Sequence, residues 1–168
     1  KKFRLNVGVI TFEPMPKMYF NKKIKNFRLL NTIQKNKILM NLGVDFLITK
    51  KFDKNFSKIR FNFFIENILS KKLDAKYIFV SNNFRFGYKR EGDVKQLVKN
   101  EKTYDYKIVK PQPLILDGKV ISSTYIRFLL EIGNLKKANK VLTRNWCIEG
   151  IVQKGRQQGK KIGFPTCN

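Results

Sequence analysis

Short apolar runs alternate with helical apolar stripes through most of the chain. Residues 7–12 form an apolar run between polar residues, which is typical of a strand buried on both faces. Glu13–Pro16 ends this strand because proline cannot donate a hydrogen bond to a ladder. A helix is indicated where apolar side chains recur at helical spacing, at Phe61, Phe64, Ile65, Ile68 and Leu69. The pattern also predicts strands at 46–49, 77–80 and 106–109 and helices at 32–42 and 93–100. The first of these two helices is expected to be capped by Thr32 and ended by Gly43.

The order of these elements predicts the fold class. Strand and helix alternate at the spacing of βαβ units, so we expect an α/β fold with a mostly parallel sheet and helices on both faces. Ligands of such sheets bind beyond the carboxyl ends of the strands. Three polar segments are therefore expected to converge on one crevice: Glu13–Pro16, Ser81–Asp93 and Ser122–Thr124. A hairpin is expected at 114–121, with Asp117-Gly118 as its two-residue turn.

A phosphate site is predicted at the start of a helix near position 123. Ser122, Ser123 and Thr124 precede an apolar-periodic segment, which is the pattern of a helix N-terminus. Free backbone N–H groups and the positive end of the helix dipole attract anions at such a start. Arg127 lies four residues after Ser123, on the same face, and its guanidinium can bind a phosphate through two hydrogen bonds. The alternative is that the hydroxyls only cap the helix and the arginine is solvated.

The character of the chain changes after a pair of helices expected at 124–132 and 135–142. Glycines then follow in quick succession, at positions 150, 155, 159 and 163, which is typical of strands and turns. We place a domain boundary near Arg144–Asn145. Residues 145–168 are too few to bury a core, so we interpret them as the beginning of a second domain that follows a first domain at 1–144.

Composition narrows the classes of function. The 168 residues include no histidine, which excludes histidine acid–base chemistry and histidine-ligated metal within this sequence. Cys147 and Cys167 have neither a metal-binding nor a disulfide-scaffold spacing, and no apolar run could span a bilayer, so we expect a cytoplasmic protein. Lys and Arg number 36 against 12 Asp and Glu. This excess keeps nucleic acid open as a partner, although the charges are spread along the chain.

Several motifs occur in a fixed order. Those of the first part are Thr11-Phe-Glu-Pro-Met-Pro16, Leu42-Gly-Val-Asp45, Asn83-Phe-Arg-Phe-Gly87 with Arg90 and Gly92-Asp93, and Ile121-Ser-Ser-Thr-x-Ile-Arg127. Those of the last part are Gly133, Ala138, Gly150-x-Val152-x-x-Gly155 and Gly159-x-x-x-Gly163-Phe-Pro-Thr-x-Asn168. In this collinear arrangement the sequence resembles the bacterial bifunctional riboflavin kinase/FAD synthetase family over essentially its whole length.

The resemblance implies a Rossmann-like nucleotidyltransferase domain that joins FMN and ATP into FAD and pyrophosphate. It also implies that the first part of a riboflavin kinase β-barrel follows. The complete barrel phosphorylates riboflavin to FMN with a second ATP. By position, Ser123, Thr124 and Arg127 would hold ATP phosphates, and Asn83 would contact the nucleotide or the reacting phosphates. The implied flavin-framing residues are Phe20, Phe64 and Phe86, and the implied kinase Mg²⁺-ATP ligands are Thr166 and Asn168.

The sequence also departs from the family pattern. That pattern begins with a strand and a G-x-F-D-x-x-H-x-G-H motif, to which nothing here corresponds, so we expect a chain truncated at both ends and inactive by itself. Three single positions differ as well. Met15 stands where the family has histidine, and Ser81 and Thr143 stand where it has glycine.

Plainer interpretations remain open for several residues. Phe64 can be a core side chain of the helix stripe, and Phe20 can anchor a loop. Arg85 and Arg90 can be solvated or paired with neighbouring acids. For the whole protein, the alternatives to FAD synthesis are a basic nucleic-acid-binding protein and a catalytically inactive homologue that binds flavin or nucleotide on the same scaffold.

Overall fold

The computed structural model describes residues 5–24, 28–151, 159 and 162–163. The chain divides into two compact units, each of which is described by itself. The first unit comprises residues 1–27 and 36–120, and the second comprises residues 28–35 and 121–168.

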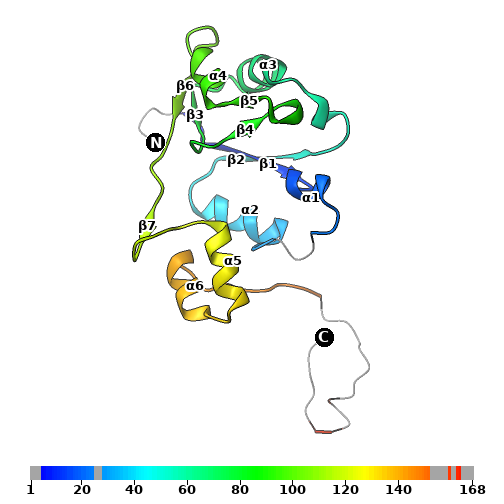
Figure 1. Cartoon of the computed structure of the whole chain (residues 1–168), viewed down its shortest axis with the longest axis vertical. Coiled ribbons are helices and arrows are strands. Elements are labelled where there is room, and N and C mark those ends of the chain that lie inside the picture. The colour runs from blue at the N-terminus through cyan, green and yellow to red at the C-terminus, as the bar shows by residue number, and fades with distance from the viewer. Residues whose placement is uncertain (1–4, 25–27, 152–158, 160–161, 164–168) are drawn as a thin grey trace. The chain divides into compact units, whose positions relative to one another are not determined.

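Parallel strands form the framework of the first unit (Figure 1). β1 (Gly8–Glu13) pairs in parallel with β2 (Phe46–Lys51), in a register that joins Gly8 to Phe46. β3 (Tyr77–Phe79) pairs in parallel with β6 (Lys107–Val109). The predicted alternation of helices with parallel strands is therefore confirmed. In the described part of the chain, however, the strands form two separate two-stranded ladders rather than one continuous sheet.

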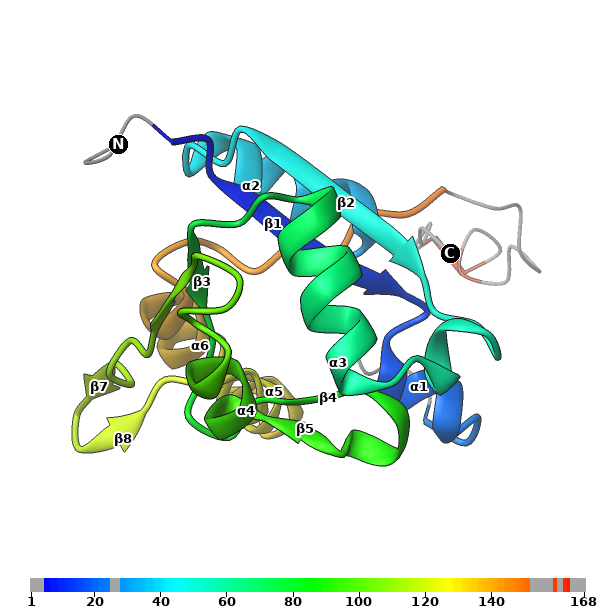
Figure 2. The same cartoon turned by 90° about the horizontal axis from the view of Figure 1, so that it is seen from above.

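The helix predicted from the stripe at Phe61 is present, but it widens after its first turn. α3 (Phe61–Phe63) passes directly into η2 (Phe64–Lys72), a π-helix, and Figure 2 shows the two as one continuous coil. In a π-helix the hydrogen bonds join residues five apart, so such residues lie one turn apart on the same face. Phe64 and Leu69 have this spacing, and both are buried.

Capping side chains fix the starts of two helices. α2 (Thr32–Asn41) is capped by Asn31 and not by Thr32, which corrects the sequence-based expectation. The Asn31 Oδ1 atom accepts from the Gln34 N–H at 2.8 Å, and Gln34 Oε1 accepts from the Asn31 N–H at 3.0 Å. α4 (Val94–Lys99) has the same reciprocal arrangement, with Asp93 as its cap. Each pair satisfies two backbone donors that a helix start leaves open.

Two hairpins complete the first unit. The predicted one is confirmed: β7 (Ile115–Leu116) and β8 (Lys119–Val120) are antiparallel, and both turn residues between them have positive φ. The second hairpin, formed by β4 (Arg85–Phe86) and β5 (Gly92–Asp93), was not predicted. Strands of two residues are too short to show an alternating pattern. The shorter helices of this unit are α1 (Pro16–Phe20), η1 (Phe56–Lys58) and η3 (Tyr88–Arg90).

A single cluster of buried side chains forms the described core of the first unit. Its members are Phe64, Ile65, Leu69, Phe86, Leu97 and Tyr106. Partly buried residues from both strand pairs, among them Ile10 of β1 and Ile78 of β3, pack against it. The one polar atom of the Tyr106 side chain is satisfied, because its hydroxyl donates to the Leu97 carbonyl at 2.7 Å. The cluster therefore ties helices η2 and α4 to both ladders.

The second unit is a helix pair with a partner segment. α5 (Ser123–Glu131) and α6 (Leu135–Leu142) bury Ile126, Leu129, Ala138 and Val141. Residues 28–35 belong to the same unit, and within it the Trp146 indole N–H donates to the Leu29 carbonyl at 3.1 Å. Thr143 ends α6 in the left-handed region at φ 55°. Glycine adopts that conformation more easily, which gives a physical reason for the glycine of the family pattern.

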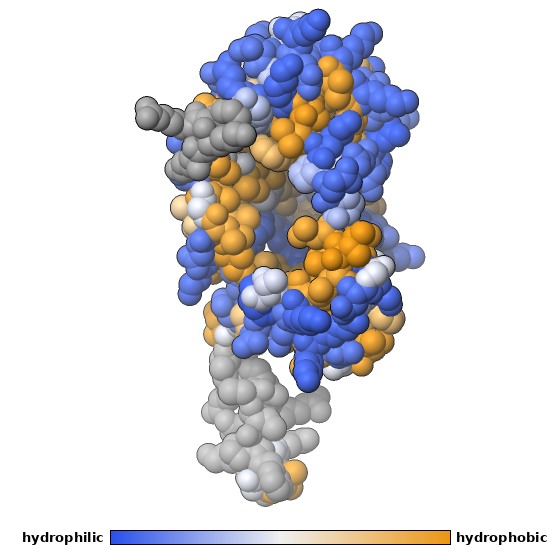
Figure 3. All heavy atoms as spheres, turned by 90° about the vertical axis from the view of Figure 1, so that its left-hand side faces the viewer, coloured by the Kyte–Doolittle hydropathy of each residue, from blue (hydrophilic) through white to orange (hydrophobic). Residues whose placement is uncertain are grey.

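The described surface is mainly hydrophilic with apolar patches. Phe79 and Leu114 are 67% and 72% exposed, and on the face drawn in Figure 3 hydrophobic residues gather between hydrophilic ones. Among the described residues, none of the helices has the length and apolar character needed to cross a membrane.

Tyr106→Phe tests the polar contact inside the core. At neutral pH we expect the free energy of unfolding to fall by about 1 kcal/mol, because the Leu97 carbonyl loses the hydrogen bond from the Tyr106 hydroxyl and keeps only the one from the Asn100 N–H at 3.1 Å. Burial raises the pKa of Tyr106 to about 12. The neutral phenol therefore stabilises the fold fully below about pH 10, and this contribution is lost as pH rises towards 12.

Urea unfolding followed by circular dichroism at pH 7 and pH 11 measures both effects. The variant should lose less stability than the wild type between these two pH values. Tyr88→Phe is the matched control, since that side chain is exposed. If the wild type and Tyr106→Phe lost the same free energy of unfolding between pH 7 and pH 11, the Tyr106 hydroxyl would not be the group whose ionisation destabilises the fold.

Candidate functional site

The loop between β3 and α4 carries two of the predicted site residues, Asn83 and Phe86. Asn83 lines a cavity of about 350 Å³, together with Arg85, Arg90 and Lys95. The Ser81 hydroxyl donates to Asn83 Oδ1 at 2.9 Å, which orients the amide. The NH₂ group of Asn83 is the part of the amide that can donate to a ligand.

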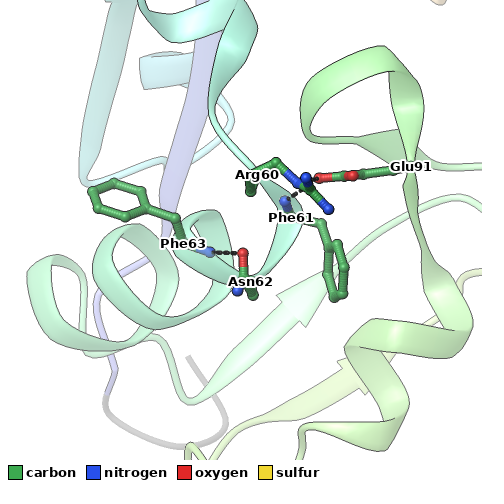
Figure 4. A network of polar contacts seen from close by, with 5 residues as sticks. All are labelled: Arg60, Phe61, Asn62, Phe63 and Glu91. Carbon is green, nitrogen blue, oxygen red and sulfur yellow. Dashed lines mark hydrogen bonds and ion pairs between the residues drawn. The ribbon is translucent and has the colours of Figure 1, made fainter.

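Glu91 ties this loop to the start of helix α3. Its Oε1 atom accepts from Arg60 Nε at 2.8 Å and from the Phe61 backbone N–H at 2.9 Å, as Figure 4 shows. The loop also lies directly against Phe61. A Cβ atom at Gly87 would stand 2.8 Å from the Phe61 nitrogen, and one at Gly92 would stand 2.7 Å from its Cβ. Close backbone approach therefore requires glycine at both ends of the η3 turn.

The three predicted flavin-framing residues belong to one series of ring contacts. Phe64 and Phe86 touch, with centroids 5.4 Å apart, and both are only 8% exposed. Phe20 is 71% exposed. Two rings that were not predicted connect it to Phe64: Phe52 lies 5.8 Å from Phe20, and Phe56 lies 5.7 Å from Phe52 and 6.5 Å from Phe64.

Burial separates the roles of these three residues. Phe64 and Phe86 are core side chains, in agreement with the plainer interpretation of Phe64, and they can support a ligand-facing wall only from behind. Phe20 offers an accessible ring face, which its contact with Phe52 holds in place. The four-residue spacing of Phe52 and Phe56 could have indicated that these two rings touch, but not that they connect Phe20 with Phe64.

The predicted helix start is confirmed in the second unit, one residue from its expected position. Ser122 is the cap of α5, and its hydroxyl accepts from the Tyr125 N–H at 3.1 Å. Ser123 and Thr124 form the first turn and are exposed. Arg127 is partly buried, and desolvation lowers the pKa of its guanidinium. The start of α5 thus carries two exposed hydroxyl residues, Ser123 and Thr124, and a cation, Arg127, one turn further along the helix.

The predicted site residues are distributed over both units. Ser123, Thr124 and Arg127 share the start of α5 in the second unit, while Asn83 and the three phenylalanines belong to the first. Their convergence on one crevice stays a prediction. The predicted kinase ligands Thr166 and Asn168 lie outside the described residues.

The described residues offer no preformed metal centre, because no group of three or more His, Cys, Asp or Glu side chains is placed to hold an ion. Mg²⁺ often binds through one or two carboxylates together with substrate phosphates.

Two family models match the chain. The one described as FAD synthetase matches residues 1–125. The chain belongs to the FAD synthetase family. A second model, described as riboflavin kinase, matches residues 142–168, next to the FAD synthetase region.

Curated relatives of this FAD synthetase family member agree with both matches. Bifunctional riboflavin kinase/FMN adenylyltransferases of Buchnera aphidicola (Schizaphis graminum strain) and Escherichia coli K12 are each 36% identical over 100% of this chain. The corresponding protein of Haemophilus influenzae is 34% identical over 99% of it. The chain spans about half the length of these relatives, 54% in each case.

A solved structure has the same fold over the same extent. It is described as a macrolide-efflux protein from Streptococcus pneumoniae and matches with a TM-score of 0.78 and 28% identity. The match covers 99% of this chain and 54% of that one. The description of this structure as an efflux protein differs from the names of the family models and of the curated relatives. The match nevertheless covers almost all of this chain, as the matches with those relatives do.

Ser122→Ala tests the cap that starts α5. We expect it to lower the free energy of unfolding by about 1 kcal/mol, because the Tyr125 N–H loses its acceptor. Ser123→Ala is the matched control and should stay within about 0.5 kcal/mol of the wild type, since Ser123 is exposed. Urea titration of both variants measures the difference. A larger loss of stability for Ser123→Ala than for Ser122→Ala would show that Ser122 is not the cap of α5.

Proposed function

We propose that the whole protein makes FAD by transferring AMP from ATP to FMN, and that it also phosphorylates riboflavin to FMN. The observation that carries this proposal is the collinear similarity of the entire chain to bifunctional riboflavin kinase/FMN adenylyltransferases. Residues 1–144 would form the Rossmann-like FMN adenylyltransferase domain, and residues 145–168 would begin the riboflavin kinase barrel. The α/β order with parallel strands supports the first assignment.

The proposed transfer makes modest demands on the protein. A phosphate oxygen of FMN attacks the α-phosphorus of ATP, the bond from that phosphorus to the bridging oxygen breaks, and pyrophosphate leaves. The attacking oxygen is already ionised, so catalysis consists mainly of positioning the two phosphates and neutralising charge. Bound Mg²⁺ would supply part of that neutralisation through the phosphate oxygens.

The start of α5 suits the ATP end of this reaction. Its exposed N–H groups and the hydroxyls of Ser123 and Thr124 can donate to phosphate oxygens. Arg127 adds a fixed positive charge on the same face, and its guanidinium can bind two oxygens at once. Partial burial strengthens this attraction because less water screens the charge.

The aromatic series suits the flavin end. Phe20 supplies an accessible flat face, and the rings behind it restrict its movement. A flavin ring gains from such walls by burying apolar surface and by offset stacking. For the kinase reaction, Thr166 and Asn168 are proposed as ligands of Mg²⁺-ATP on the basis of the family resemblance.

Arg127→Ala tests the phosphate role. In the longest natural form of the protein, we expect FAD formation from FMN, ATP and Mg²⁺ to fall about a hundredfold or more, because a charge that stabilises the departing pyrophosphate is removed. Chromatographic separation of FAD from FMN gives the rate. Lys136→Ala is the matched control, since Lys136 is an exposed cation on the neighbouring helix α6. Unchanged turnover in Arg127→Ala, with an intact circular dichroism spectrum, would refute this role.

A further inference from the structure

A second cavity of the first unit lies between helix α4 and the start of the α3–η2 coil. Its volume is about 440 Å³, within the range of small-ligand sites. Two cations, three amides and three apolar or aromatic side chains line it, and none of its lining residues is an acid. None of the residues predicted for FAD synthesis lines it either. This composition suits a ligand that combines an apolar ring, polar ring edges and negative charge.

Packing against the core holds the apolar floor of this cavity in place. Ile65 is only 1% exposed and belongs to the buried cluster. Phe61 and Tyr104 are partly buried and pack against the same cluster. The Phe61 backbone is fixed as well, because its N–H donates to Glu91 Oε1 at 2.9 Å. The cavity thus offers a flat ligand ring two aromatic side chains whose positions the fold already determines.

Hydrogen bonds orient the three amides of the cavity. Asn62 Oδ1 accepts from the Phe63 N–H at 2.9 Å (Figure 4), and Gln96 Oε1 accepts from the Asp93 N–H at 3.1 Å. Asn100 Nδ2 donates to the Gln96 carbonyl at 2.8 Å. The NH₂ groups of Asn62 and Gln96 can therefore donate to a ligand, and Asn100 Oδ1 can accept from it. The edge of a nucleic-acid base presents both acceptors and donors to such groups.

Three lysines follow one another along this surface at helical spacing. Lys95 and Lys99 line the cavity from α4, and Lys102 lies in the turn that follows. All three are exposed, and in the part of the chain that the structure describes none of them takes part in an ion pair. The nearby acid Glu101 is directed to β6, because its Oε1 atom accepts from the Ile108 N–H at 2.7 Å. This surface therefore carries positive charge that neighbouring acids do not neutralise.

The extent of the charge favours a polymer over a free nucleotide. Lys102 lies outside the lining of the cavity, and the sequence as a whole carries 36 Lys and Arg against 12 Asp and Glu. A strand of several phosphates meets more of this charge than one phosphate does. Aromatic side chains on which bases stack, beside cations that follow the backbone, are the usual elements of single-strand binding.

We propose that this cavity binds one nucleotide of a single-stranded nucleic acid, with its base on the floor formed by Phe61 and Tyr104. Lys95, Lys99 and Lys102 attract the neighbouring phosphates. The lysines need no fixed geometry for this, because the electrostatic part of the affinity comes from the release of counterions. This binding is additional to FAD synthesis and does not depend on it.

Replacing both Lys99 and Lys102 by Gln tests the charged part of the surface in the longest natural form of the protein. Fluorescence anisotropy with a labelled oligouridylate of about twelve nucleotides gives the affinity. We expect a loss of about tenfold or more near 0.1 M salt. The slope of log affinity against log salt should also decrease by about 1.4, because each lost phosphate contact removes about 0.7.

The matched control replaces Lys37 and Lys110 by Gln. It removes the same charge from two exposed residues of the same unit that lie outside the cavity lining. This variant should keep the affinity of the wild type within about twofold. Equal losses in the two double variants would show that the attraction is diffuse and would overturn the proposed surface, as would a wild type that does not bind the strand.

Two further titrations test whether a base occupies the cavity. A strand of abasic nucleotides keeps the phosphates but has no rings, so it should bind about tenfold more weakly. Asn62→Asp keeps an oxygen acceptor for the Phe63 N–H but replaces the NH₂ donor by a negative oxygen, and it should weaken binding by about tenfold. Asn55→Asp adds the same charge at an exposed position outside the cavity and is the control. Equal affinity for both strands, or equal effects of both substitutions, would refute the seated base.

Competition with the substrates separates this inference from the proposed function. Saturating ATP or FMN should leave the strand bound, and displacement by either would place the strand at a substrate site and overturn the inference. The variant without Lys99 and Lys102 should form FAD at the rate of the wild type. If the wild type binds the strand but forms no FAD, the proposed function fails and this inference stands.

Discussion

Burial of one helix face holds the first unit together. Phe64, Ile65 and Leu69 of η2 pack against Leu97 of α4 and Tyr106, and partly buried residues of both strand pairs close around them. No backbone ladder joins β1–β2 to β3–β6 in the described chain, so side-chain packing carries that connection. Removing apolar surface from water is the main source of stability for such a contact, and it is non-directional. The directional element is the hydrogen bond from Tyr106 to the Leu97 carbonyl, which fixes α4 against the following strand.

The candidate site depends on this core. The loop that carries Asn83 ends in Asp93, the cap of α4, and α4 itself is anchored by the fully buried Leu97. Phe86 extends from the same loop into the cluster. Asn83 therefore lies on a loop whose backbone is fixed at its α4 end and through Phe86. Positioning of this kind is what a reaction between two already charged phosphates requires.

The sequence predicted the parts of the fold that are governed by local chemistry. The apolar runs located four strands, and Asp117-Gly118 located a hairpin, because these signals lie within a few residues of each other. The cap of α2 was wrong by one position because asparagine and threonine can both accept the backbone hydrogen bond. The β4–β5 hairpin was missed because its two-residue strands show no alternating pattern, and the π-helical turns were missed because they keep the apolar stripe of an ordinary helix. The series of rings from Phe20 through Phe52 to Phe64 joins segments far apart in sequence. No pattern in one sequence reports such contacts, whereas collinear motifs did indicate the family and the residues at the start of α5.

Glu91 illustrates how one contact restricts sequence change at distant positions. Its carboxylate is shared between Arg60, 31 residues earlier, and the Phe61 N–H. An apolar replacement at position 91 would leave a backbone donor without its acceptor and a cation without its counter-charge. A change at Arg60 alone would still leave the backbone contact. Natural variants of this protein should therefore tolerate substitution at Arg60 more readily than substitution at Glu91.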